Sequence, residues 1–132
     1  HGVEIDLEDI PDLGPILMIL AALSKGETVF HSVERLRYKE SDRLAVMMAI
    51  LDQFNVTYTY ANDCLKITGQ ELLDGNKVFD THGDHRIAMA LAIASIKCSD
   101  AIVINHPEVV SKSYPEFFDV FKQLGGRIHE LE

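Results

Sequence analysis

The chain reads as one succession of structural elements that occurs twice, and this repeat constrains the fold more than any other feature. In each half, a strand pattern and a helix pattern are followed by a second strand pattern and a second helix pattern. Asp12 and Asp84 each open a first helix, while Lys39 and Lys112 each precede a second, at an offset of about 72 residues. This period is longer than that of most solenoids, so we interpret it as the duplication of a larger unit.

Periodicity and turn residues set the expected boundaries of the elements. Leu44, Met47, Met48 and Leu51 recur at the spacing of a helix with one buried face. The predicted helices are 16–25, 40–55, 84–96 and 117–124, and the predicted strands are 3–7, 27–33, 56–60, 64–68, 77–80, 101–105 and 127–131. Residues 113–116 have the pattern of a capping box at the last helix.

These elements predict an α/β (α+β) fold built from two βαβαββ units, residues 1–72 and 73–132. The length of 132 residues suits one domain or a piece of a larger one, and the start at His1 is typical of a segment of a longer protein. We therefore expect residues 1–132 to form a single partial domain.

Composition excludes several classes of protein. The net charge of -9 argues against nucleic acid as a partner, because an acidic surface repels phosphate backbones. No apolar stretch approaches the roughly 20 residues of a membrane span, and we recognise no signal peptide. Cys64 and Cys98 lack metal or redox spacing and are expected to be small buried side chains in a reducing compartment, which favours the cytoplasm.

Basic side chains gather at predicted helix starts, where the helix dipole disfavours them. Lys39 and Arg43 lie at one start, in the stretch LRYKESDR, and His85, Arg86 and Lys112 lie at two others. Local ion pairs of Glu40 with Arg43 and of Lys39 with Asp42 offer a simpler explanation, but each contributes only about 0.2–0.5 kcal/mol. We therefore expect the five groups to bind a shared anionic ligand, since helix starts and arginine forks both favour phosphate and carboxylate.

Two carboxylates are candidate proton-transfer groups. Glu40 lies among cations that would keep it ionised, and Asp12 lies at a helix start expected to face the same region, where it could also be no more than an N-cap. His82, Asp84 and His85 are metal-ligand types at close spacing, but no zinc motif accompanies them, so we expect no metal and assign Asp84 as an N-cap.

Four stretches together resemble the C-terminal part of the EPSP synthases, the enolpyruvyl transferases that act on shikimate 3-phosphate. They are IPD near the start, LRYKESDR, DHRIAMALAIA and SKSYPEFF, in the order of the family and over most of the chain. The resemblance implies an inside-out α/β barrel, in which helices lie inside the sheets and each of two domains has three βαβαββ units. It also implies transfer of enolpyruvyl from phosphoenolpyruvate to the 5-hydroxyl of shikimate 3-phosphate, with no metal or organic cofactor.

The resemblance also implies roles for individual residues. Asp12 resembles the base at the shikimate 5-hydroxyl, and Glu40 resembles the carboxylate that moves a proton at the enolpyruvyl methylene. Lys39 resembles a contact to shikimate 3-phosphate, while the phosphoenolpyruvate clamp, where glyphosate would also bind, comprises Arg43, His85 or Arg86, and Lys112. No role is transferred to Arg35. The family's N-terminal domain would be the missing partner, so we expect no turnover by this chain alone; a non-catalytic anion-binding module of the same fold is the alternative.

Overall fold

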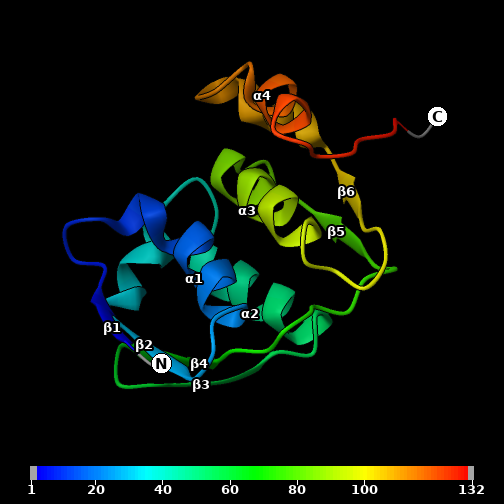
Figure 1. Cartoon of the computed structure of the whole chain (residues 1–132). Coiled ribbons are helices and arrows are strands. Elements are labelled where there is room, and N and C mark those ends of the chain that lie inside the picture. Colours follow the sequence, from blue (N-terminus) through cyan, green and yellow to red (C-terminus); the bar gives the residue numbers. More distant parts are fainter. Residues whose placement is uncertain (1–2, 131–132) are drawn as a thin grey trace.

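The computed structural model describes residues 3–130, and its first half is a complete βαβαββ unit (Figure 1). Its elements are β1 (Val3–Asp6), α1 (Gly14–Ala22), β2 (Glu27–His31), α2 (Arg43–Gln53), β3 (Thr57–Ala61) and β4 (Cys64–Thr68). The four strands form one sheet in the order β1-β2-β4-β3. β1 and β2 run parallel and are connected through α1, as parallel neighbours need a crossover connection, and the other pairs are antiparallel.

The predicted hairpin of the first unit is confirmed. Asn62 and Asp63 form its two-residue turn with φ values of 52° and 60°. Asn and Asp tolerate this left-handed conformation, and a turn with two positive φ values matches the twist of the flanking strands. The turn pairs Ala61 with Cys64 and thereby fixes the register of the whole hairpin.

The second half repeats the order of the first as far as its second helix. β5 (Val78–Asp80), α3 (His85–Ser95), β6 (Val103–Asn105) and α4 (Phe117–Gln123) follow one another, with β5 and β6 paired in parallel. A short 3-10 helix follows β2 at Val33–Tyr38 and β6 at Pro107–Lys112. The strand predicted at 127–131 is wrong over residues 127–130, which form no strand, and residue 131 lies outside the described residues.

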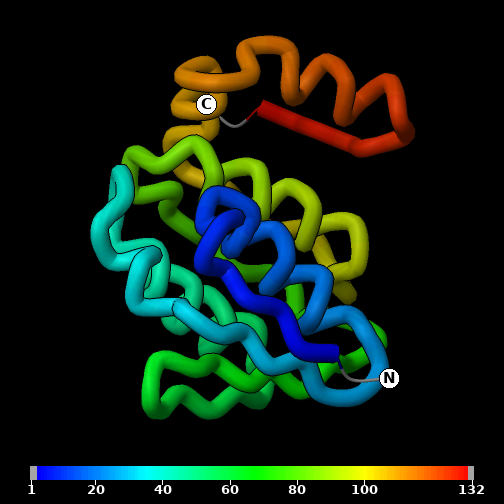
Figure 2. The backbone as a smooth tube through the Cα atoms, turned by 90° about the vertical axis from the view of Figure 1, so that its left-hand side faces the viewer, coloured from blue at the N-terminus to red at the C-terminus, as the bar shows by residue number. Residues whose placement is uncertain are grey.

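Helix α1 lies between the four-stranded sheet and α3, so a helix is enclosed as predicted and the α/β fold class is confirmed. α1 and α2 pack against one face of the four-stranded sheet, α3 packs on α1 away from that sheet and beside β5 and β6, and α4 lies on the far side of α3 (Figures 1 and 2). The main core comprises Met18, Ile19, Phe30, Met47, Leu51, Leu65, Phe79 and Leu91, all almost fully buried. α3 is buried on most sides because Ala88 and Met89 form a second cluster with Val110. No helix among residues 3–130 is long and apolar enough to cross a membrane.

The starts of α1 and α2 differ from the predictions, because the residue that caps a helix depends on how the preceding chain leads into it. α2 begins at Arg43 rather than near residue 40, since the Asp42 carboxylate accepts the backbone N–H of Ala45. Asp12 is not an N-cap: it lies in the 3-10 helix Pro11–Leu13, and no side-chain hydrogen bond caps α1. The N-cap predicted at Asp84 is confirmed, because its carboxylate accepts the backbone N–H of Arg86.

Candidate active site

A buried arginine connects the two units where the helix starts meet. Arg43, the first residue of α2, is fully buried, yet its guanidinium contacts three carboxylates. Nε and Nη2 donate to the two oxygens of Asp84 at 2.7 and 3.1 Å, and Nη1 and Nη2 donate to Asp12 and Glu40 at 2.9 and 2.8 Å. These bonds use four of the five N–H groups of the guanidinium, so Arg43 organises the carboxylates and can offer a ligand at most one donor.

Asp84 is the buried counterion of this arginine. Its side chain is fully buried and also accepts the hydroxyl of Ser41 at 2.7 Å. Burial alone would raise the pKa of Asp84, but hydrogen bonds from Arg43 and Ser41 and the charge of Arg43 hold that pKa below its usual range. Burial likewise acts to lower the pKa of Arg43, and the bonds to Asp84 and Asp12 raise it on balance. Both groups are therefore charged at neutral pH.

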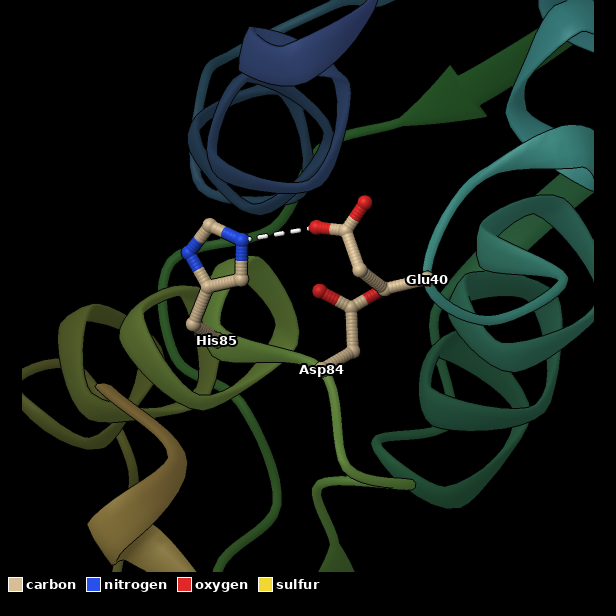
Figure 3. Close-up of side chains that lie close together, drawn as sticks. All are labelled: Glu40, Asp84 and His85. Carbon is tan, nitrogen blue, oxygen red and sulfur yellow. Dashed lines mark hydrogen bonds and ion pairs between the residues drawn. The ribbon is translucent and has the colours of Figure 1, made fainter. Parts of the chain in front are cut away.

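Glu40 is held from two sides, one in each unit. Its Oε2 accepts Arg43 of the first unit at 2.8 Å and His85 Nε2 of the second at 2.7 Å (Figure 3). Because a carboxylate only accepts, Nε2 carries the proton, and Nδ1 of a neutral ring accepts the Ser113 hydroxyl. A chain of proton-exchanging groups thus runs from Ser113 through His85 to a carboxylate that is 46% exposed.

Asp12 lies on the other side of the same arginine. The 3-10 helix before α1 presents its carboxylate to Arg43, and Lys39 Nζ lies 3.9 Å from the same oxygen. Asp12 is 55% exposed, so water or a ligand can reach it. A half-exposed carboxylate beside two cations can take part in proton transfer or in binding a hydroxyl group.

The two remaining predicted cations lie around the start of α3. Lys112 Nζ donates to the backbone carbonyl of Gly83 at 2.8 Å, in the turn that leads into the helix. Arg86 is the second residue of α3, and its Nε is buried with no hydrogen-bond partner among the described residues. Leaving such a donor unpaired costs about 1–3 kcal/mol, so a hydrogen bond from it to an acceptor would be favourable.

Most side chains of the cluster were predicted from the sequence, but two serines that hydrogen-bond to them were not. The structure brings together Asp12, Lys39, Glu40, Arg43 and His85, while Lys112 and Arg86 flank the start of α3. Ser41 and Ser113 were missed as members. The capping box predicted from Ser113 is wrong: no side chain caps α4, and the hydroxyl contacts His85 instead. No sequence pattern around Ser113 indicates this contact, because His85 is 28 residues away in the sequence.

The local ion pairs considered for LRYKESDR are present only in part. Glu40 does pair with Arg43, but Asp42 pairs with Arg37 at 3.0 Å rather than with Lys39. Arg37 also bonds Glu34, and these two hydrogen bonds raise its pKa. Arg37 thus stabilises the turn before α2, while Lys39 is directed to Asp12.

Ligand atoms of Glu40, Asp84 and His85 lie within 4.8 Å of one another, the geometry of a three-residue metal site (Figure 3). Both oxygens of Asp84, however, already accept donors from Arg43, Ser41 and Arg86. A divalent ion would also lie beside a buried guanidinium, whose charge repels it. The donor set fits its own arginine better than it fits a metal, and His82, named with this group from the sequence, is exposed and outside it.

Comparisons with known proteins place the chain in one family. The family model described as EPSP synthase (3-phosphoshikimate 1-carboxyvinyltransferase) matches residues 1–121. The 3-phosphoshikimate 1-carboxyvinyltransferases of Clostridium acetobutylicum and Clostridium novyi are 48% and 46% identical over 130 residues. These matches cover 98% of this chain but 30% of the relatives, so the chain spans under a third of their length.

Solved structures agree with the family match. The EPSP synthase of Acinetobacter baumannii superposes with a TM-score of 0.80 at 33% identity, over 88% of this chain and 27% of that protein. The enolpyruvyl transferase NikO of Streptomyces tendae reaches 0.77 at 17% identity, over 98% of this chain and 29% of that protein, and therefore supports the fold alone.

Proposed function

The chain belongs to the EPSP synthase family, and on that premise we propose that it supplies one side of the active site of an enolpyruvyl transferase. The complete enzyme joins phosphoenolpyruvate to the 5-hydroxyl of shikimate 3-phosphate and releases phosphate. The observation that carries the proposal is the position of Glu40, held at 2.8 Å by Arg43 and at 2.7 Å by His85 while its carboxylate stays accessible. Residues 1–72 and 73–132 are two units of a larger domain in this proposal.

Each step of the addition and elimination has a candidate group. Asp12 accepts the proton of the 5-hydroxyl as its oxygen attacks the enolpyruvyl carbon. Glu40 takes a proton from solvent through the exposed Ser113 hydroxyl and His85, gives it to the methylene carbon, and takes one back from the methyl group when phosphate leaves. Arg43 keeps both carboxylates in place and lowers the electrostatic cost of their proximity.

Anion binding falls to the groups that have donors to offer. Arg86 has a buried Nε without a partner among the described residues, and the Lys112 ammonium is exposed, bonding a carbonyl with one of its three donors. These two suit the phosphate and carboxylate of phosphoenolpyruvate and also glyphosate. Lys39, whose side chain is 28% exposed, suits the phosphate side of shikimate 3-phosphate. In this proposal Arg43 contributes at most its last N–H group to the clamp.

The rest of the enzyme is the partner that this proposal requires. β1 is an edge strand, and an apolar groove beside it is lined by Val3, Ile5, Leu17, Leu20, Ala21 and neighbouring Ser24 and Thr28. Val3 and Leu20 are 53% and 46% exposed, which favours a further unit of the same domain as the cover. We also propose a cytoplasmic location, since both cysteines are free thiols.

Kinetics of the reconstituted enzyme test this function. Phosphate release is measured for the chain alone and for the chain joined to the N-terminal remainder of a relative, with both substrates present. We expect turnover only from the joined protein. In that protein, Arg86→Ala or Lys112→Ala should raise the KM for phosphoenolpyruvate by about 10- to 100-fold, the loss of a hydrogen bond to a charged group.

Arg35→Ala is the matched control, because Arg35 is an exposed cation paired only with Glu8 at 2.8 Å in the described structure. Its kinetics should match those of the unmodified protein. Unchanged KM in both Arg86→Ala and Lys112→Ala would end the assignment of these residues. Tight calorimetric binding of phosphoenolpyruvate by the chain alone, with no turnover on reconstitution, would favour an anion-binding module.

A further inference from the structure

A thiol, an imidazole and a carboxylate form a hydrogen-bonded row across the outer face of the four-stranded sheet. Cys64 Sγ of β4 lies 3.2 Å from His31 Nδ1 of β2, and His31 Nε2 lies 2.7 Å from Glu4 Oε1 of β1. The side chains alternate along each strand, and Phe30 and Leu65 beside them are fully buried. His31 and Cys64, which are direct cross-strand neighbours, therefore face away from the helices and the core.

The direction of the hydrogen bonds follows from the carboxylate. Glu4 accepts only, so Nε2 of His31 carries the ring proton and Nδ1 of the neutral ring is an acceptor. Cys64 Sγ–H then donates to Nδ1. This is the order of nucleophile, base and orienting group that activates thiols for covalent chemistry.

The neighbouring charged side chains on this face of the sheet, Asp6 and Lys66, are bonded to groups other than His31. Asp6, the cross-strand neighbour of His31, is already occupied: the backbone N–H of Glu8 and the hydroxyl of Ser32 bond its carboxylate and lower its pKa. Lys66, two residues along β4, pairs with Glu27 at 3.6 Å. Glu4 is thus the carboxylate that orients the His31 ring.

Cys98, the second cysteine, has a backbone carbonyl as its hydrogen-bond partner rather than a histidine. Both cysteines are partly exposed rather than buried, so the expectation of two buried side chains is wrong. Cys98 Sγ–H donates to the carbonyl of Ala94 in α3 at 3.3 Å. Burial and the nearby charge of Asp74 raise the pKa of Cys98 to about 11, so it is inert at neutral pH.

We propose that Cys64 is a reactive thiol that forms mixed disulfides with small organic disulfides, with His31 as its base and Glu4 as a positioning residue. The Sγ–H bond breaks as the proton passes to His31 Nδ1, and Sγ attacks one sulfur of the disulfide. A new S–S bond forms, the old one breaks, and the departing thiolate takes the proton back from His31. The organic disulfide is the oxidant, and the site is separate from the proposed transferase chemistry.

The test uses dithiodipyridine, an uncharged disulfide that the acidic surface does not repel. Release of thiopyridone is followed for the whole chain between pH 6 and 9, and peptide mass spectrometry locates the modified cysteine. At pH 6.5 we expect Cys64 to react at least about 10-fold faster than Cys98, and at least about 10-fold faster than Cys64 in the His31→Gln variant. The rates of Cys64 in the unmodified chain and in the His31→Gln variant should become equal at high pH. Glu4→Gln should lose part of the enhancement.

Glu27→Gln is the matched control, because it removes a carboxylate from the same face without touching His31. Its rate should equal that of the unmodified chain. A simple loss of packing would change the rate at all pH values alike, whereas loss of the base changes the low-pH rate. Equal Cys64 rates at pH 6.5 in the unmodified chain and the His31→Gln variant would overturn the proposal. If the His31→Gln variant does not fold, the Glu4→Gln variant, changed at an exposed position, provides the test. An unchanged Cys64 rate at pH 6.5 in that variant would overturn the proposal.

Discussion

Arg43→Met is the perturbation that most directly tests how the two units are held together. Methionine keeps the apolar length of the side chain and removes the charge, so Asp84 is left fully buried without its counterion. Asp12 and Glu40 are 55% and 46% exposed and can turn to water, so each bond lost there contributes less than about 1 kcal/mol. Most of the loss therefore falls on Asp84, and breaking a buried pair on one side costs about 3–5 kcal/mol.

That loss is large for a chain of 132 residues, because domains are stable by only about 5–15 kcal/mol. Urea unfolding followed by far-ultraviolet circular dichroism should show a lower midpoint with an unchanged slope. The midpoint of thermal unfolding should fall by roughly 10–20 °C. Arg35→Met, which removes an exposed cation 49% accessible to solvent, is the control and should change stability by less than about 1 kcal/mol.

A double-mutant cycle separates the ion pair from packing. Asp84→Asn keeps an acceptor for the backbone N–H of Arg86 while removing the charge. Combined with Arg43→Met, it leaves no unpaired charge, so the loss should be about 1–3 kcal/mol smaller than the sum of the two single losses. Additive losses, or an Arg43→Met variant within about 1 kcal/mol of the unmodified chain, would refute a buried ion pair at this position.

Three further substitutions test the charge of Asp84 and the backbone at two glycines. The pKa of Asp84 is lowered on folding, so its ionised form adds to the free energy of unfolding in full above the unfolded-state pKa of about 4, and this contribution is lost as the pH falls below that value. The urea midpoint should therefore drop less steeply between pH 7 and pH 2 in Asp84→Asn than in the unmodified chain. Parallel curves of midpoint against pH would contradict this. Gly69→Ala should destabilise the chain by about 1–3 kcal/mol, because the new Cβ would overlap the backbone carbonyl of Ser24 after α1. Gly83→Ala, whose Cβ meets no atom within 4 Å but whose φ is +68°, should lose only about 1 kcal/mol in the same denaturation assay.

The parts of the fold predicted from sequence are those that depend on neighbouring residues. Leu44, Met47 and Leu51 are fully buried as their spacing predicts, and Asn62 and Asp63 form the expected turn. Helical periodicity and turn chemistry act over a few residues, so they can be recognised in a single segment. The boundaries that failed, at the start of α2 and beyond α4, depend on how the rest of the chain approaches those ends.

The candidate site was predicted by residue type and only partly by geometry. Charged residues out of place at helix starts identified Lys39, Arg43 and His85, and the structure gathers them with Asp12 and Glu40. Their arrangement differs from a simple ring of cations around an anion. The cations are instead interleaved with carboxylates. The net charge of -9 shows that the chain is rich in carboxylates, but it does not predict which of them lie beside these cations.

Local spacing along the chain was enough to predict the order of the elements up to α4 and the apolar faces that pack into the core, because helix and strand periods act over a few residues. Local spacing could not predict that Arg43 turns inward to the carboxylates of Asp12 and Asp84, which are 31 and 41 residues away, because that contact forms only when the chain folds. A buried charge is tolerated only where opposite charges and hydrogen bonds replace its lost water. Arg43, Asp12 and Asp84 lie in three separate segments, and their meeting is a property of the folded chain.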